Sequence, residues 1–140
     1  MGFRSRTSRS NQVFSSKRSQ HSPQNNCAIQ WASENGHLEI VKFLVEQGAN
    51  IQDNNNLAIR WASIKGHLEV VKFLVERGAN IQADDNYAVK YASMCGYFKV
   101  VNFLVERGAN IQADNYVVKY ASMYGHHKVV EFLVENGAEL

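Results

Sequence analysis

Apolar residues in this chain recur at intervals of three and four over several short segments. The clearest segment is LEVVKFLVER at 68–77, where one side of a helix would carry Leu68, Val71, Leu74 and Val75. That spacing is the apolar stripe of an amphipathic helix, and charged residues occupy the opposite side. We therefore expect a helix here, ended by the glycine that follows it.

A second short helix is expected just upstream of the first. The segment LAIRWASIK at 57–65 is rich in apolar residues and is followed by Gly66, a residue type that commonly caps helix C-termini. The stretch GANIQADDN at 78–86 begins with glycine and is rich in Asn and Asp, which is typical of a turn followed by an extended finger. Two short helices and one finger therefore make up a unit.

This unit occurs four times along the chain. The sequence GHLEIVKFLVEQGANIQ at 36–52 returns almost unchanged from residues 66 and 96, and the fourth copy reads GHHKVVEFLVENGAEL. The copies open at Gly36, Gly66, Gly96 and Gly125, so the period is 30, 30 and then 29 residues, with the lost residue between Ala113 and Tyr116. Periods of this length indicate stacked repeats, and we expect them at 26–55, 56–85, 86–114 and 115–140.

Neither helix of a unit is long enough to be stable alone in water, so each needs a neighbour to cover its apolar stripe. Small and bulky side chains recur at equivalent positions of the upstream helix: Ala62, Ala92 and Ala121, preceded by Trp61, Tyr91 and Tyr120. The small residues allow neighbouring helices to approach closely. These features predict an all-α solenoid of stacked helix-turn-helix repeats with short fingers, and about three repeats are needed for such an array to fold.

The repeats resemble those of the ankyrin family over residues 26–140. Gly36 to Asn50 nearly spell out the family pattern G-H-L-E-I-V-x-x-L-L-x-x-G-A-D. The resemblance implies an ankyrin-type solenoid that is not an enzyme and that binds another protein. With a finger shorter than in the usual repeat of about 33 residues, the compact unit looks most like the ankyrin repeat proteins of mimivirus-type giant viruses.

The upstream helix departs from the family pattern T-P-L-H-x-A-A. Four residues stand in place of the proline, namely Ala28, Ala58, Ala88 and Val117, and four in place of the histidine, namely Gln30, Arg60, Lys90 and Lys119. Proline pre-organises the first turn of a helix, so the start of each upstream helix should be less sharply fixed. The family histidine orders the loops by hydrogen bonding, so a different set of hydrogen bonds must order them here.

The charge of the chain divides it into two parts. Residues 1–25 carry five cations, seven serines and no acid, whereas the rest has ten cations against 13 acids, a net charge of −3. The basic segment is too poor in apolar residues to fold alone, so we expect a disordered tail. Such a tail is able to contact nucleic acid or an anionic membrane through phosphate groups, which makes a tail-mediated tether an alternative function.

The positions that vary most between repeats are the pair before each opening glycine. They form a stripe on the concave side of the expected solenoid: Glu34, Asn35, Ile64, Lys65, Met94, Cys95, Met123 and Tyr124. The stripe becomes more apolar and aromatic toward the C-terminus, which is typical of a binding patch. The alternative is that the apolar members pack against the next repeat as core.

A row of cations, Arg60, Lys90 and Lys119, forms a second candidate site beside the fingers. Asp53, Asp84, Asp85 and Asp114 lie close by in the sequence, so local ion pairing is the simpler interpretation. The sharper interpretation is a stripe that binds phosphate or an acidic partner.

The remaining polar residues indicate no chemistry. Histidines 37, 67 and 126 recur at one repeat position, with Tyr97 in the third copy and His127 as a neighbour in the fourth. Ligands spread along the stack favour loop hydrogen bonds over a metal site, because zinc needs three or four converging ligands. Cys27 and Cys95 lie two repeats apart and should be free thiols. No hydrolase elbow, phosphate loop, dinucleotide fingerprint or zinc-protease motif occurs, so we expect no catalytic residue and no cofactor.

No apolar run is long enough to span a membrane, and the charged N-terminus does not resemble a signal peptide, so we expect an intracellular protein, cytoplasmic or in the host cell if viral. The terminal repeats keep apolar residues that a polar cap would replace, which predicts marginal stability, self-association or docking against a partner. The leading prediction is a non-catalytic module that binds an unidentified protein on its concave helix and finger surface. A repeat remnant without a dedicated partner is the other alternative.

Overall fold

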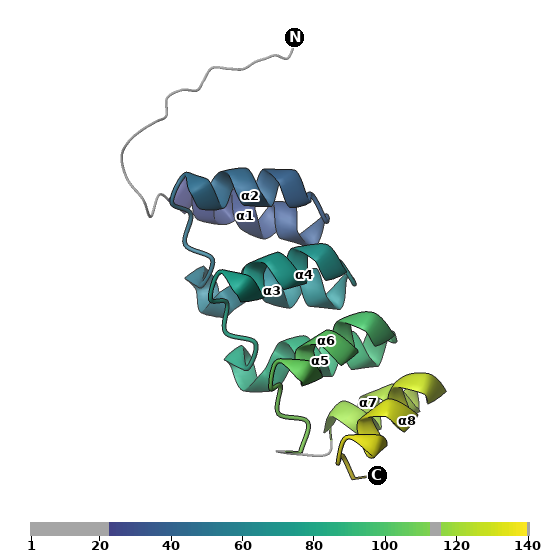
Figure 1. Cartoon of the computed structure of the whole chain (residues 1–140). Coiled ribbons are helices and arrows are strands. Elements are labelled where there is room, and N and C mark those ends of the chain that lie inside the picture. The colour runs from purple at the N-terminus through teal and green to yellow at the C-terminus, as the bar shows by residue number, and fades with distance from the viewer. Residues whose placement is uncertain (1–22, 113–115, 140) are drawn as a thin grey trace.

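The computed structural model describes residues 23–112 and 116–139. The helices, in chain order, are α1 (Pro23–Glu34), α2 (Leu38–Glu46), α3 (Asp53–Ile64), α4 (Leu68–Glu76), α5 (Ala83–Cys95), α6 (Phe98–Glu106), α7 (Tyr116–Met123) and α8 (His127–Glu135). They follow one another down the stack as four helix pairs (Figure 1). The first 22 residues of the expected tail lie outside the described part, and the last three belong to α1.

The helices form two layers. The first layer contains α1, α3, α5 and α7, each packed against its neighbours, and the second contains α2, α4, α6 and α8 (Figure 1). Within residues 23–112 and 116–139 there is no strand. The prediction of an all-α solenoid of stacked repeats is therefore confirmed.

The core lies between the two layers and runs the length of the stack. Ile59 of α3 and Leu74 of α4 are fully buried there, and burying such a side chain contributes about 1.5–3 kcal/mol. The alanines at which helices were expected to approach closely, Ala62, Ala92 and Ala121, are also fully buried. Larger residues at these positions would push neighbouring first-layer helices apart.

Consecutive repeats touch where a ring of one packs on a glycine of the other. A Cβ at Gly36 would lie 2.7 Å from Nδ1 of His67, and a Cβ at Gly66 would lie 2.7 Å from the Tyr97 ring. Both glycines have a positive φ, which a side chain would strain. The His67 ring also makes a 2.9 Å hydrogen bond between its Nε2 and the Glu34 carbonyl oxygen, as expected for a loop-ordering histidine.

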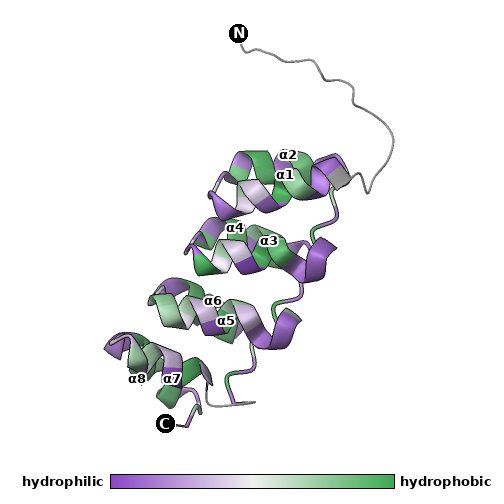
Figure 2. Ribbon diagram, turned by 180° about the vertical axis from the view of Figure 1, so that it is seen from behind, coloured by the Kyte–Doolittle hydropathy of each residue, from purple (hydrophilic) through white to green (hydrophobic). Residues whose placement is uncertain are grey.

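The segments between repeats differ from the expected extended fingers. They are compact turns that lead into a left-handed first turn of the next first-layer helix, seen at Asn54–Asn56 of α3 and Asp84–Asn86 of α5, where φ is 56 to 60°. Asn and Asp tolerate this conformation better than other residues with a side chain. Figure 2 shows these turns as hydrophilic tips along one edge of the stack.

Buried asparagines hold these turns in place. Oδ1 of Asn56 accepts a 2.9 Å hydrogen bond from the backbone N–H of Asn80, and Asn86 does the same for Asn110 at 3.0 Å. In the first repeat, Oδ1 of Asn26 accepts the equivalent hydrogen bond from the backbone N–H of Asn50 at 2.7 Å. These asparagines therefore supply the loop-ordering network that replaces the family histidine.

Glutamines extend this network to the next repeat. The Gln52 side chain donates to the Gly78 carbonyl oxygen at 2.7 Å, and the Gln82 side chain donates to that of Gly108 at 2.8 Å. Each bond joins the loop of one repeat to the end of the next second-layer helix. The loops therefore help to fix the spacing of the repeats.

Three serines of the first layer have buried hydroxyl groups that make no hydrogen bond within the described residues. The hydroxyl oxygens of Ser33, Ser63 and Ser93 have no hydrogen-bond partner within the described part of the chain, whereas Ser122 at the same position of the last repeat is exposed. A buried hydroxyl without a partner lowers the stability of the fold. The recurrence of serine at these positions has no physical explanation in the structure.

The asparagine network leads to a test with a matched control. Asn56→Gly keeps the left-handed backbone accessible but leaves the Asn80 N–H without its acceptor, so we expect a loss of about 1–3 kcal/mol in the free energy of unfolding. Asn55→Gly, at an exposed left-handed position, should leave the stability unchanged or slightly higher. Urea unfolding followed by circular dichroism measures both, and equal losses would contradict the role of Asn56.

The unsatisfied serines lead to a second test. Ser63→Ala removes the buried hydroxyl and favours the helix, so it should raise the free energy of unfolding by about 1 kcal/mol or more. Ser122→Ala changes the same group at an exposed site and should have a smaller effect. Thermal melts of the two variants compare them directly, and a destabilised Ser63→Ala protein would show that the hydroxyl is used.

Candidate functional site

One side of the first layer faces away from the second layer. In α3 the side chains of Ala58, Ile59 and Ala62 are buried in the core, whereas those of Arg60 and Trp61 are half-buried. Helical geometry places residues 57, 60, 61 and 64 together on the side opposite the core. We call the surface formed by these four positions and their equivalents in α1, α5 and α7 the first-layer face; it corresponds to the side that the sequence predicted as concave.

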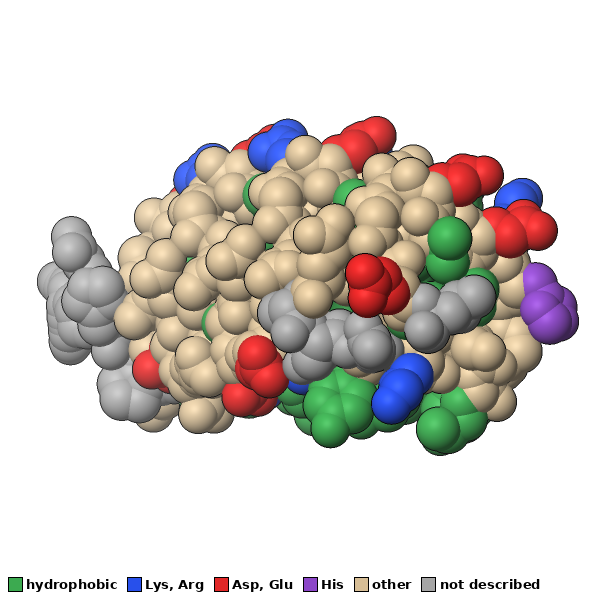
Figure 3. Space-filling view, turned by 90° about the horizontal axis from the view of Figure 1, so that it is seen from below, with side chains coloured by type: hydrophobic (Ala, Val, Ile, Leu, Met, Phe, Trp, Pro, Cys, Tyr) green, Lys and Arg blue, Asp and Glu red, His purple; other side chains and the backbone are tan. Residues whose placement is uncertain are grey.

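Aromatic rings line the first-layer face. The Tyr87 and Tyr91 ring centroids are 4.2 Å apart, those of Tyr91 and Tyr120 are 6.1 Å apart, and Tyr116 stacks on Tyr120 at 5.8 Å. The rings of Tyr91 and Tyr120 were expected as packing bulk, and they are half-buried. Figure 3 shows hydrophobic side chains beside a basic one along the lower edge, opposite an edge where charged side chains dominate.

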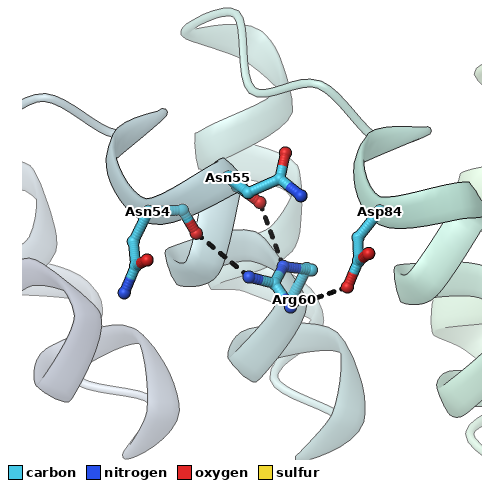
Figure 4. A network of polar contacts seen from close by, with 4 residues as sticks. All are labelled: Asn54, Asn55, Arg60 and Asp84. Atoms are coloured by element: carbon cyan, nitrogen blue, oxygen red, sulfur yellow. Dashed lines mark hydrogen bonds and ion pairs between the residues drawn. The ribbon is translucent and has the colours of Figure 1, made fainter.

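Arg60 joins this face to the turns (Figure 4). Its Nε and Nη2 donate 3.0 Å hydrogen bonds to the carbonyl oxygens of Asn55 and Asn54, and Nη1 lies 3.2 Å from Oδ2 of Asp84 at the start of α5. The guanidinium also lies 4.9 Å from the centroid of the Tyr87 ring. Arg60 therefore holds the left-handed turn at the start of α3 against the start of α5.

The other cations of the row are placed differently. Nζ of Lys90 pairs with Oδ2 of Asp85 at 3.2 Å and lies 5.4 Å from the centroid of the Tyr116 ring. Lys119 is exposed, and Asp114, its neighbour in the sequence, lies outside the described residues. The expected local ion pairing is thus present at Arg60 and Lys90, where the pair joins α3 to α5 in one case and stays within α5 in the other.

The variable pairs change in exposure along the stack. Met123 and Tyr124 are among the most exposed large side chains, at 69% and 58%, whereas Ile64 and Met94 are half-buried. In the first repeat Glu34 is half-buried and Asn35 is exposed, with its side chain donating to the Trp31 carbonyl oxygen. The apolar part of the stripe is therefore accessible mainly at the last repeat.

Lys65 and Cys95 contribute further contacts to the middle of the stripe. Nζ of the exposed Lys65 lies 5.9 Å from the centroid of the Trp61 ring. Burial raises the pKa of the Cys95 thiol, and the positive charge of Lys65 offsets only part of that rise. The thiol therefore stays protonated at neutral pH and acts as a weakly polar contact.

Burial and the neighbouring Tyr91 likewise raise the pKa of Tyr87, against the opposing charge of Arg60. Its phenol is neutral over the physiological pH range and keeps a hydrogen atom to donate. The Tyr87 ring is therefore uncharged, and the charges beside it are those of Arg60 and Asp84.

The histidines and cysteines form no cluster in the described part of the chain. Within residues 23–112 and 116–139 no three His, Cys, Asp or Glu side chains converge as metal ligands would. Cys27 and Cys95 are both free thiols. No helix of this part of the chain has the length and apolarity needed to cross a membrane.

The second layer offers a shallow groove of different character. It lies between α2 and α4, encloses about 460 Å³, and is lined by Leu38, Lys42, Glu46, Glu69, Lys72, Phe73, Glu76 and Arg77. Acidic and basic side chains alternate along it, which is the composition of a solvated surface. The first-layer face, with its aromatic rings, is the stronger candidate site.

A family model described as ankyrin repeats in three copies matches residues 10–85 and 57–115. The chain therefore belongs to the ankyrin repeat family, whose members are generally protein-interaction modules and typically non-catalytic. No curated protein matches the chain, so the resemblance to giant-virus proteins stays a prediction. The match begins at residue 10, inside the segment that composition assigns to the tail.

Sequence reasoning missed two features of this region. Tyr87 and Tyr116 were not singled out, although their position, shared with Cys27 and Leu57, lies one helical turn before the tryptophans and tyrosines at 31, 61, 91 and 120. The buried asparagines were missed as well, although Asn26, Asn56 and Asn86 recur at one repeat position. A comparison of the repeats column by column would have found both.

Arg60 allows a test of how the face is built. Arg60→Lys leaves a single ammonium where the guanidinium bonds two carbonyl oxygens and a carboxylate, so the free energy of unfolding should fall by about 1–2 kcal/mol. Arg77→Lys, on the exposed surface of the second layer, should change it by less than about 0.5 kcal/mol. Urea titration of both variants measures these changes. If the Arg60→Lys and Arg77→Lys proteins are equally stable, the contacts of the Arg60 guanidinium contribute nothing to the stability.

Proposed function

We propose that the protein binds another protein through the first-layer face and the adjoining variable stripe. The observation that carries the proposal is the group of contacting Tyr rings at 87, 91, 116 and 120 on the side of the first layer that the core does not use, with Trp31 and Trp61 at the equivalent positions of the first two repeats. Aromatic and Met side chains, together with Arg, are the residue types enriched at the centres of protein interfaces. The family's general role as an interaction module supports the same conclusion.

The layout of the face suggests how a partner is held. The apolar side chains Met123 and Tyr124 are the most accessible and offer anchor positions, while half-buried Tyr91 and Tyr120 form a rigid floor beside them. Rigid aromatic rings lose little conformational entropy on binding. Lys65 and Lys119 at the border favour a partner segment with apolar side chains flanked by acidic ones.

The experiment compares three purified baits in a pull-down with quantitative mass spectrometry. The Met94→Ala, Met123→Ala and Tyr124→Ala triple variant should reduce capture of the true partners by about tenfold or more, as expected for losing interface anchors. The control is the Arg77→Ala and Arg107→Ala double variant, which removes cation contacts from the Phe73 and Phe103 rings of the second layer. It should capture the same proteins as the unchanged chain.

Each alternative function has its own result. If all three baits capture the same proteins, binding does not use the first-layer face and the proposal is wrong. Capture that falls steeply with salt and contains nucleic acid would instead favour the tether through the five cations of residues 1–25. A bait that enriches nothing above a bead control would support a repeat remnant without a partner.

A further inference from the structure

The stack exposes apolar side chains at its N-terminal end whose equivalents are more buried in every other repeat. Ile40 is 44% exposed, whereas its equivalents Val70, Val100 and Val129 are at most 2% exposed. Phe43 is 58% exposed, and its equivalent Phe103 is 9% exposed. The reason is geometric: in repeats 2 to 4 these side chains lie against the preceding repeat.

The C-terminal end shows the complementary pattern. Val130 is half-buried and Val134 is 40% exposed, whereas Val41, Val71 and Val101, the equivalents of Val130, are fully buried. Nothing in the described chain lies within 4 Å of the place where a Cβ on Gly125 would stand. At Gly36, Gly66 and Gly96 the equivalent space is filled by a ring of the next repeat, namely that of His67, Tyr97 or His126.

The two ends carry the same residue types that pack together inside the stack. His37 and Phe43 at the N-terminal end match His67 and Phe73, and the C-terminal end presents a glycine, a serine and two valines at positions where each earlier repeat has the same residues. We propose that the chain stacks head to tail on a second copy of itself. In this junction α1 and α2 of one copy pack on α7 and α8 of the other, with the His37 ring seated on Gly125.

The charges at such a junction are at least as favourable as those inside the stack. Lys42 and Lys72 both line the groove between α2 and α4. At a junction of two copies the position of Lys42 is taken by Glu131, and the position of Lys72 is taken by Lys42. One pair of like charges is therefore replaced by a pair of opposite charges, which favours association by a modest amount.

A second copy fits the N-terminal end better than the chain's own leading segment does. Residues 1–22 contain four large apolar residues, Met1, Phe3, Val13 and Phe14, among five cations and seven serines. A second copy presents a surface already shaped for Ile40 and Phe43, as three internal junctions show. Because the two ends are different surfaces, the contact is heterologous and each added copy presents a new free end, so growth is open-ended unless the rotation per copy closes a ring.

The test uses the full chain in sedimentation velocity from micromolar to millimolar protein. The unchanged protein should sediment faster as its concentration rises, without reaching a limiting size. Ile40→Glu blocks one end and Val134→Glu blocks the other, at positions that are exposed in the monomer, so each variant alone should stay monomeric. Asn102→Glu adds the same charge to the second layer in the middle of the stack and should associate like the unchanged chain.

The decisive sample is an equimolar mixture of the two end variants. It retains one intact junction, between Val134 of one variant and Ile40 of the other, so its limiting mass should be twice that of the monomer and no larger. Loss of association in one variant only would indicate a symmetric dimer through a single end and overturn the proposal. Monomeric behaviour of the unchanged chain at every concentration would also overturn it, and would point to a different cover for α2.

Discussion

The close approach of neighbouring repeats is the constraint on which the rest of the structure depends. Rings at positions 67 and 97 lie where a side chain on the preceding Gly36 or Gly66 would have to stand. Fully buried alanines allow the same closeness between first-layer helices. A short helix that is marginal alone becomes stable because each neighbour covers one of its sides. The ring and glycine contacts also fix the register, since the ring fits at only one point of the facing repeat.

The loops follow from this closeness. With thirty residues to a repeat, little chain is left between the second-layer helix of one repeat and the first-layer helix of the next. Consecutive Asn and Asp residues make the connection by a left-handed turn, a backbone region that few other side chains tolerate. Buried asparagine acceptors and the Arg60 guanidinium then satisfy the backbone groups that such a turn exposes. The turns are therefore held by side chains that also border the candidate binding face.

Near-identical repeats give this protein two kinds of surface with different origins. The first-layer face exists because only one side of each first-layer helix is needed for the core, which leaves the other side free to carry rings and cations. The end surfaces exist because each repeat is made to fit a neighbour, and the first and last repeats in the described chain each lack one. The binding that we propose for the face would use residues that differ between repeats, whereas the association that we propose for the ends would use residues that are the same.

The sequence by itself determined the number of repeats, the two helices in each and the alanines of the close contacts, because these depend on periodicity and residue size, which survive in a linear pattern. Comparison of the repeats also identified Met123 and Tyr124 as a variable pair. The two cysteines were predicted to be free thiols because they lie two repeats apart in the sequence. Only the tertiary structure decided that the fingers are left-handed turns, that Asn26, Asn56 and Asn86 order the loops, and that Arg60 joins α3 to α5. These features depend on hydrogen bonds between residues 24 positions apart, and such partners are identified only when the chain is folded.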